Sequence, residues 1–153
     1  MQIQSSIFGL IDVNEDKIIT FDEGLPAFED EKNFVLIHDE EFVDSIFCWL
    51  QSIIMPELTF SLLDIFALLP DYSPNIEQES LQKLGITEKD EFFVYTIATV
   101  PEDISNITVN LQGPIVINKN TLKGAQLIAS NEEYTTKYKI FDELKERKQV
   151  AKC

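Results

Sequence analysis

Apolar residues occur in short runs along this chain, and turn-forming residues separate the runs. The runs are rich in Val, Ile, Phe and Thr, which is typical of β-strands. Two of the runs, at residues 17–21 and 107–111, alternate partly between apolar and polar positions, as half-buried strands do. The pattern predicts ten strands, at residues 7–13, 17–21, 34–37, 46–50, 59–65, 92–100, 107–111, 115–118, 125–129 and 134–141.

Helical signals are fewer. Ser73 can cap one short helix, Pro74 suits its first position, and Gly85 can end it. A second helix can begin near Asp142, but its segment has few apolar residues, so we expect a charged tail that is frayed or helical. The turn at residues 14–16 predicts a hairpin between the first two strands.

Many short strands with few helices predict a mainly β protein, a small single-domain β-barrel-like fold of short antiparallel strands with one short helix. The domain is expected to cover residues 1–141, and residues 142–153 form the tail. A chain of 153 residues with 44% hydrophobic residues and 11 Phe can bury a sizeable core. High charge without low hydrophobicity is not the composition of a disordered chain.

Charge is unevenly distributed along the chain, whose formal net charge is -15. Residues 1–103 hold 4 basic and 22 acidic residues, a net charge of -18, whereas residues 104–153 hold 8 basic and 5 acidic residues, a net charge of +3. An acidic surface repels nucleic acid and anionic membrane, and it attracts basic proteins. The composition therefore favours a protein partner and no direct contact with nucleic acid or membrane.

The sequence also indicates where the protein works. No apolar run approaches the length of a membrane span, about 18 residues, and the N-terminus lacks the pattern of a secretion signal. Cys48 lies in an expected strand and Cys153 is the last residue, so no disulfide is expected between them. Reduced thiols predict a cytoplasmic protein.

Motifs for catalysis or metal binding are incomplete. Residues 12–23 have the oxygen ligands of a calcium loop at four positions, but Lys17 stands where the loop requires glycine, and Pro26 follows where a helix should leave. The single histidine, His38, lies before an acidic loop, and one histidine with two distant cysteines is a poor zinc set. We therefore expect a protein without enzymatic activity, without a cofactor and without a metal site.

Three segments are more distinctive. Residues 21–29 contain Leu25-Pro26, which imposes an extended turn and is expected to place Phe28 in the core. Residues 49–52, Trp-Leu-Gln-Ser, end an apolar strand. Residues 109–118 form two strands that meet at Gly113-Pro114, and residues 124–128 follow. Taken alone, each segment is explained by structural roles, because its glycines and prolines shape turns and its apolar residues fill the core.

Taken in order, the segments resemble the flagellar assembly factor FliW family from about residue 7 to residue 141. The resemblance rests on Gly24-Leu25-Pro26 with Phe28-Glu29, Phe34-Val35-Leu36, Trp49-Leu50-Gln51-Ser52, Asp64, Leu69-Pro70-Asp71-Tyr72, Ala98-Thr99-Val100-Pro101, Val109-Asn110-Leu111, Pro114-Ile115-Val116-Ile117-Asn118 and Gly124-Ala125-Gln126. The chain departs from the family at Ala27, where a second glycine is usual, at Ile65, where proline is common, and at Ile53-Ile54-Met55, where polar residues are usual.

The resemblance implies a β-barrel-like fold and a non-enzymatic cytoplasmic protein with two partners. Members of the family bind the RNA-binding repressor CsrA, which relieves its block on flagellin translation, and they bind flagellin, which competes with CsrA. The candidate contacts to CsrA are Glu23, Glu29, Asp64, Asp71 and Tyr72. The candidate contacts to flagellin are Asn110, Pro114 and Gln126, in the less acidic last third.

The sequence leaves the manner of CsrA inhibition open. An acidic protein can occupy the basic RNA-binding surface, or it can lie beside that surface and repel RNA. Two other classes also stay open. One is a small-ligand-binding barrel of unrelated function, whose cavity would be lined by inward Phe side chains. The other is a hydrolase built on carboxylates, although no spacing singles out a catalytic pair.

Overall fold

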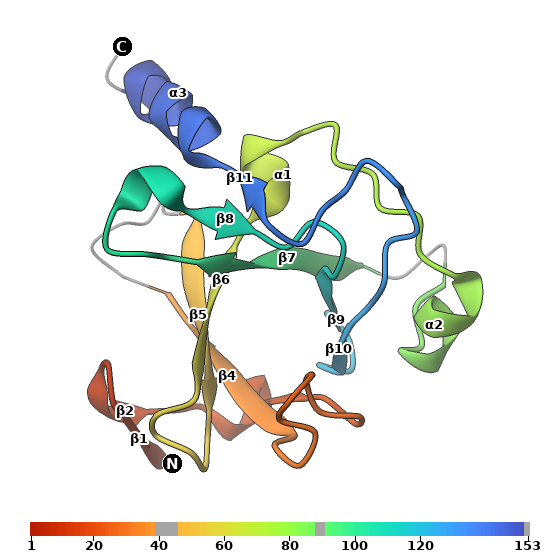
Figure 1. Ribbon diagram of the computed structural model, residues 1–153. Helices are drawn as coiled ribbons and strands as arrows, with labels where there is room; N and C mark the ends of the chain where they lie inside the picture. Colours follow the sequence, from red (N-terminus) through yellow and green to blue (C-terminus); the bar gives the residue numbers. More distant parts are fainter. Residues whose placement is uncertain (39–45, 88–90, 152–153) are drawn as a thin grey trace.

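The computed structural model describes residues 1–38, 46–87 and 91–151, and the side chains of residues 1–38, 46–87 and 91–146. Figure 1 shows α1 and α3 near each other and α2 beside β9 and β10. The β1–β2 hairpin lies at the lower left, away from all three helices. The strands are β1 (Gln2–Ser5), β2 (Gly9–Asp12), β3 (Ile19–Thr20), β4 (Asn33–Ile37), β5 (Phe47–Ser52), β6 (Thr59–Leu63), β7 (Phe92–Thr99), β8 (Thr108–Val109), β9 (Ile115–Asn118), β10 (Gly124–Gln126) and β11 (Tyr138–Lys139). The helices are α1 (Ile65–Leu68), α2 (Gln78–Lys83) and α3 (Phe141–Ala151), with 3-10 turns at Glu15–Lys17 and Ile104–Asn106.

Antiparallel pairing joins most strands into one sheet in the order β10-β9-β7-β6-β5-β4-β3. The two ends of this order approach each other through a bridge between Thr20 and Lys123, where the Thr20 N–H donates to the Leu122 carbonyl over 2.9 Å. The expectation of a mainly β, barrel-like fold of short antiparallel strands is confirmed.

The long strand β7 carries two short strands along one edge. Tyr95 faces Ile115 of β9, and Ala98 faces Val109 of β8. Between β8 and β9 the chain bends at Gly113-Pro114, where proline cannot donate a ladder hydrogen bond. The predicted corner is therefore present, and it divides one pairing edge between two strands.

The predicted hairpin between the first two strands is wrong. β2 pairs instead with β1, with Ile3 opposite Ile11, and β3 pairs with β4. The Asn14 side chain accepts a hydrogen bond from the Asp16 N–H over 2.9 Å and caps the 3-10 turn that follows it. This turn redirects the chain away from β2. The strand β1 was missed because only one of its four residues is strongly apolar.

The helix α2 confirms one predicted end and corrects the other. Gly85 has φ of +70°, and its N–H donates to the Gln82 carbonyl, so the helix ends where expected. The start lies at Gln78 and not near Ser73, because the Ser73 N–H donates to the Tyr134 hydroxyl and holds the preceding segment extended. The short helix α1, which includes Ile65, was not predicted.

The helix α3 begins within one residue of the position expected for the tail helix. The Leu144 N–H donates to the Ile140 carbonyl, and Phe141 and Leu144 pack against the core. The first turn of α3 is thus anchored to the sheet. The boundary between domain and tail at residue 141 stays a prediction.

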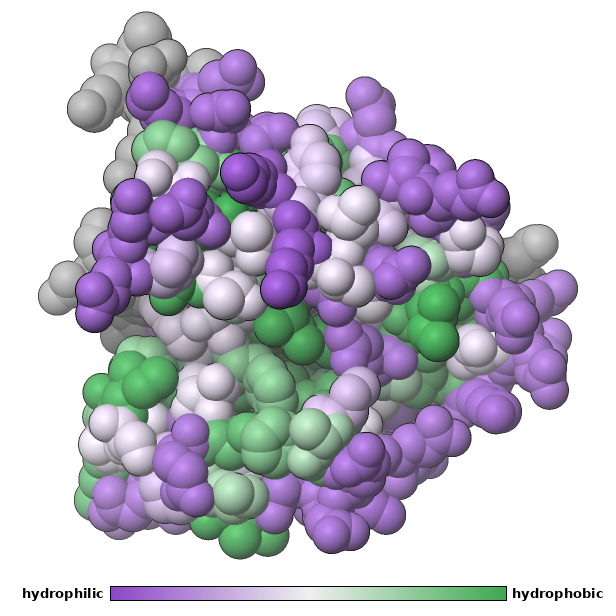
Figure 2. All heavy atoms as spheres, viewed as in Figure 1, coloured by the Kyte–Doolittle hydropathy of each residue, from purple (hydrophilic) through white to green (hydrophobic). Residues whose placement is uncertain are grey.

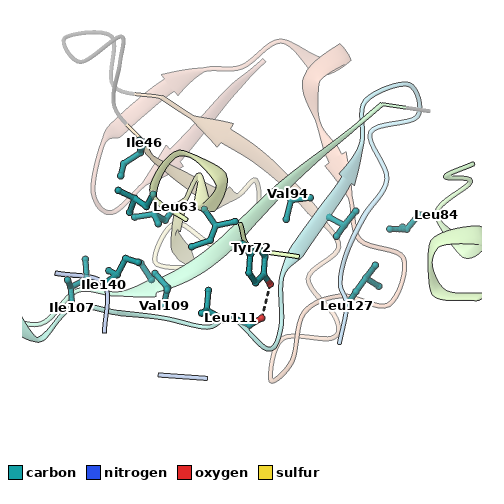
Figure 3. Close-up of a cluster of buried hydrophobic side chains, with 14 of the residues drawn as sticks. Ile46, Leu63, Tyr72, Leu84, Val94, Ile107, Val109, Leu111, Leu127 and Ile140 are labelled. Atoms are coloured by element: carbon teal, nitrogen blue, oxygen red, sulfur yellow. Dashed lines mark hydrogen bonds between the residues drawn. The ribbon is translucent and has the colours of Figure 1, made fainter. Parts of the chain in front are cut away.

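Three groups of buried side chains fill the interior, and the smallest of them consists of Ile3, Val13 and Val35. The largest one extends from Ile46, Ile107 and Ile140 at one end to Leu84 and Leu127 at the other, as Figure 3 shows. Burying each such aliphatic side chain contributes about 1.5–3 kcal/mol to folding.

The second group lies under β3, β4 and β5, where the rings of Phe21 and Phe34 meet edge to face at 5.5 Å. The expectation that Phe28 lies in the core is wrong. Its side chain is 36% exposed and contacts the ring of Phe60 at the surface, because the turn at Ala27 directs it outward.

Across the described ranges 1–38, 46–87 and 91–151, every helix is too short or too polar to cross a membrane.

Candidate functional site

A cleft of about 420 Å³ lies between α2 and the segment that contains β10. Asn75, Glu77 and Lys83 belong to the α2 wall, residues 124–128 form the opposite wall, and Asp22 and Glu23 lie at one end. The cleft forms where β3 leaves the edge of β10. After Thr20 the chain turns toward β4, and the Phe21 N–H donates to the Lys32 carbonyl over 2.7 Å.

A glycine is required beside this cleft. A Cβ atom on Gly124 would lie 2.9 Å from the ring of Phe21, which is fully buried. Only glycine therefore lets β10 approach the core so closely.

The cleft is acidic. Asp22, Glu23 and Glu77 line it together with one cation, Lys83. Lys123 forms an ion pair with Asp22 at 3.4 Å, which leaves Glu23 and Glu77 as the carboxylates available to a ligand. A cationic group would be attracted to this cleft.

The four carboxylates predicted to contact CsrA, Glu23, Glu29, Asp64 and Asp71, are all exposed. Glu23 and Glu29 lie at the two ends of one turn, and the Glu29 carboxylate accepts a weak hydrogen bond from the Ala27 N–H over 3.3 Å. Glu23 lines the cleft described above, whereas Glu29, Asp64 and Asp71 do not.

Tyr72 differs from the other predicted contacts because it is only 4% exposed. Its hydroxyl donates to the Leu111 carbonyl over 2.7 Å (Figure 3). Its ring lies 4.8 Å from that of Tyr134. Burial, and to a lesser extent the neighbouring Tyr134, raises the pKa of Tyr72 above its ordinary value. The side chain thus supports the surface near Asp71 from beneath.

Asp64 lies at the start of α1 beside a second hollow of about 320 Å³. This hollow is lined by Phe66, Phe92 and Phe93, whose side chains are partly exposed. Burial, and then the negative charge of Asp64, raises the pKa of the Cys48 thiol to about 12. The Cys48 thiol is therefore neutral at physiological pH and is a poor nucleophile.

The three residues predicted to contact flagellin gather around Gly113. The Asn110 side chain accepts from the Gly113 N–H over 2.9 Å, and the Gln126 side chain donates to the Gly113 carbonyl over 3.0 Å. Pro114 is buried, and its carbonyl accepts from the Leu127 N–H. Asn110 and Pro114 therefore shape the corner, whereas Gln126 lines the cleft.

The structure brings together Glu23 and Gln126, which the sequence assigned to different partners. The acidic first part of the sequence and its less acidic last part therefore meet at this cleft. Sequence reasoning missed Glu77 and Ile128, which line the same cleft. Ile128 belongs to a predicted strand and looked like a core residue, but its side chain is 76% exposed.

A separate apolar surface lies on the β1–β2 hairpin. Ile7, Leu10 and Ile54 are exposed there, and the Ser6 N–H ties the hairpin to the loop after β5 by donating to the Pro56 carbonyl. Figure 2 shows a hydrophobic area at the lower left, where Figure 1 places this hairpin. Ile54 belongs to the segment in which the chain departs from the FliW pattern.

Within residues 1–38, 46–87 and 91–146, no group of three or more His, Cys, Asp or Glu side chains could hold a metal ion. In the calcium-like segment, residues 15–17 form the 3-10 turn described above. His38 is exposed, and the acidic residues that follow it lie outside the described residues.

The fold and the cleft define a small, mainly β protein with an open, acidic surface groove and a filled interior. A family profile for FliW protein matches residues 2–140. The flagellar assembly factor FliW of Lachnospira eligens is 44% identical over 147 residues, which cover 95% of this chain and 97% of that protein. That of Syntrophomonas wolfei is 42% identical over 151 residues, covering 99% and 96%.

A crystal structure of a flagellar assembly factor FliW superimposes with a TM-score of 0.83 at 36% identity, covering 92% of this chain and 97% of that one. The chain belongs to the FliW family of flagellar assembly factors.

Proposed function

We propose that this protein is a non-enzymatic, cytoplasmic regulator that binds CsrA and flagellin. By binding CsrA it relieves the repression of flagellin translation, and flagellin competes for the same protein. The proposal is supported by membership of the FliW family together with the exposure of Glu23, Glu29, Asp64 and Asp71 on a strongly acidic molecule.

The acidic surface suits CsrA because a protein that grips RNA carries positive charge for the phosphates. Glu23 and Glu29 lie on one turn at the end of the cleft, where two carboxylates can meet a basic surface together. Asp64 and Asp71 would add two further carboxylate contacts to CsrA from the region of α1. Tyr72 would act by holding the chain beside Asp71, since its hydroxyl is bonded to Leu111.

Flagellin binding suits the wall that contains β10. Gln126 offers an amide there, and Leu127 and Ile128 add apolar surface to the same wall. Asn110 and Pro114 would act indirectly, because they hold the corner on which Gln126 rests. Since Glu23 lines this cleft too, the two partners would meet overlapping surfaces.

RNA release tests the proposal directly. Purified CsrA is bound to a fluorescent leader RNA from a flagellin message, and fluorescence anisotropy is followed as this protein is added. We expect the RNA to be released, and we expect added flagellin to restore the RNA complex. No release at any protein concentration, with CsrA shown to be active, would contradict the proposal.

Matched variants locate the surface. We expect the double variant Glu23→Gln with Glu29→Gln to release RNA less effectively, by about tenfold or more in the concentration required, because two contact charges are lost. Glu102→Gln with Glu132→Gln removes the same charge from exposed positions elsewhere and should change that concentration much less. Equal effects would remove Glu23 and Glu29 as contacts.

The same assay separates the two modes of inhibition. If this protein occupies the RNA-binding surface, excess RNA will reverse its effect completely. If it lies beside that surface, inhibition will persist at a plateau as the RNA concentration rises.

A further inference from the structure

The outer edge of β10 carries main-chain groups that no other strand covers. The Lys123 carbonyl accepts from the Asn118 N–H, and the N–H groups of Leu127 and Ala129 donate to Pro114 and Gln112. The odd-numbered residues therefore direct their main-chain groups toward β9 and its extension. Because these directions alternate along a strand, Gly124, Gln126 and Ile128 direct theirs outward.

A neighbouring contact confirms this direction. The carbonyl of Leu122, the preceding even-numbered residue, accepts the Thr20 N–H of β3 over 2.9 Å. This edge therefore already pairs with a strand at one point. The parallel bridge between Thr20 and Lys123 also pairs the Gly124 N–H with the Thr20 carbonyl, and beyond that point β3 turns away toward β4. At the other end of this edge, the Ser130 N–H donates to the Asn75 carbonyl over 2.9 Å. Between these two contacts, none of the bridges and main-chain hydrogen bonds found among the described residues reaches the outward groups of Gln126 or Ile128.

The uncovered edge lies inside the acidic cleft and not on an open face. Residues 124–128 form one wall of the cleft, and Glu23 and Glu77 line it together with one unpaired cation, Lys83. Natural proteins usually protect such edges with charge, proline or a bulge, because an exposed edge pairs with other chains. Here Gln126 is partly exposed and Ile128 is exposed and apolar, so this stretch of the edge is left accessible.

We propose that this edge binds an extended, basic segment of a partner protein by strand addition. The segment would continue the place of β3 along β10 and bond to the outward groups of Gln126 and Ile128. A Lys or Arg side chain of the segment would meet Glu23 or Glu77, and an apolar side chain would cover Ile128. The inference concerns how a segment binds, and it does not depend on which partner of the proposed function supplies it.

Hydrogen exchange measured by NMR tests the proposal with a defined probe, a capped pentapeptide of the sequence Thr-Lys-Val-Thr-Val, at concentrations up to about 1 mM. We expect exchange of the Gln126 and Ile128 amides to slow by about twofold at half-saturation, while the Gly124 amide, which β3 already holds, and the inward amides of Leu127 and Ala129 keep their rates. A peptide with Glu in place of Lys should bind more weakly. If the peptide saturates the protein without the alternating protection, the proposal is overturned. It is also overturned if no alternating protection develops by the highest peptide concentration.

Two substitutions at one position separate main-chain from side-chain contact. Ile128→Pro removes an outward N–H at an edge position where proline is tolerated, whereas Ile128→Ala removes the side chain and keeps the N–H. We expect at least about fivefold weaker peptide binding for Ile128→Pro than for Ile128→Ala. Unchanged exchange at Leu127 and Ala129 will show that both variants are folded, and equal binding by both variants would refute strand addition.

Two further outcomes are informative. Protection of Gln126 and Ile128 without peptide, rising with protein concentration, would mean that a second copy of this chain covers the edge, and it would overturn the proposal. The RNA-release assay uses no peptide, so its failure would remove the proposed function while leaving the result for the edge intact.

Discussion

Ala27 is a residue whose backbone conformation conflicts with its side chain. It has φ of +73°, in the left-handed region that costs a residue with a Cβ atom about 1–2 kcal/mol. It lies in the turn that begins at Gly24, where a Cβ atom would come within 2.4 Å of the Glu29 main chain. Glycine at position 24 is thus obligatory, and alanine at position 27 stores strain between the two carboxylates that we assign to CsrA.

We expect Ala27→Gly to stabilise the protein by roughly 0.5–1 kcal/mol. The relief of backbone strain exceeds the greater entropy that glycine has in the unfolded chain. Urea unfolding followed by circular dichroism measures the change. Ala67→Gly, in the short helix α1, is the control and should destabilise. A loss of stability for Ala27→Gly would show that the turn is not strained at this residue.

The buried thiol of Cys48 predicts how stability depends on alkaline pH. The folded state raises its pKa from 9.0 to about 12, so the stability linked to the neutral thiol is complete below pH 9 and is lost as the pH approaches 12. We expect the free energy of unfolding to fall by up to about 1.4 kcal/mol per pH unit in this range. The pKa values of Tyr72 and Tyr95 are also raised by burial, so these residues add to the loss above pH 10.

Between pH 9 and 10 the thiol titrates in the unfolded chain before the tyrosines do. Urea unfolding in this interval should therefore show a smaller pH dependence for Cys48→Ala than for the parent protein. The same slope in both would mean that Cys48 is accessible to solvent in the folded state.

At the scale of elements, Gln51 determines the loop between β5 and β6. Its side chain is fully buried, and its amide nitrogen lies 3.0–3.3 Å from the carbonyls of Ser52, Met55, Pro56 and Leu58. Its carbonyl oxygen accepts the Thr59 hydroxyl. The Gln-Ser pair of the family pattern thus has a structural explanation, because both side chains bond to this loop.

We expect Gln51→Leu to destabilise the protein by about 2–3 kcal/mol, since it removes the buried hydrogen bonds that this amide makes to the loop carbonyls and to the Thr59 hydroxyl. Chemical unfolding measures the loss. Gln4→Leu is a matched control on the exposed face of β1 and should change stability by less than about 0.5 kcal/mol. If the two substitutions cost the same, the amide of Gln51 does not organise the loop.

The elements that could be predicted are those whose own residues determine them. Strand β9 was predicted with its observed bounds, because Ile115–Asn118 is a continuous buried run between a proline and a turn. Strand β1 was missed because the partner β2 stabilises it more than its own apolar content does. Helix α1 was not predicted, and its first residue, Ile65, was read as the end of a strand because an apolar, buried residue fits either structure.

At the scale of the whole molecule, the cleft depends on topology that no local pattern reveals. Glu23 and Gln126 are far apart in the chain, and they meet because the sheet brings β3 back beside β10. The exposed carboxylates could be predicted from composition, whereas their grouping could not. Burial of Tyr72 was equally hidden, because its partner Leu111 lies 39 residues further along the chain.

The net charge of -15 leads to a prediction for the whole surface. Long-range attraction raises the rate at which a basic partner is encountered, and salt screens it, with a Debye length of about 10 Å at 0.1 M. In stopped-flow measurements with CsrA, we expect the association rate constant to fall by at least about tenfold between 50 mM and 500 mM salt. A flat salt response would show that the acidic surface does not steer the encounter.

The two double variants separate steering from contact. Each double variant removes two negative charges, whether it carries Glu23→Gln with Glu29→Gln or Glu102→Gln with Glu132→Gln. Both should therefore slow association by a similar factor. Only the first pair should also speed dissociation, because only those carboxylates are expected to touch CsrA. If the second pair speeds dissociation instead, the partner binds a surface remote from the cleft, and the exposed turn at Glu23 serves only to attract it.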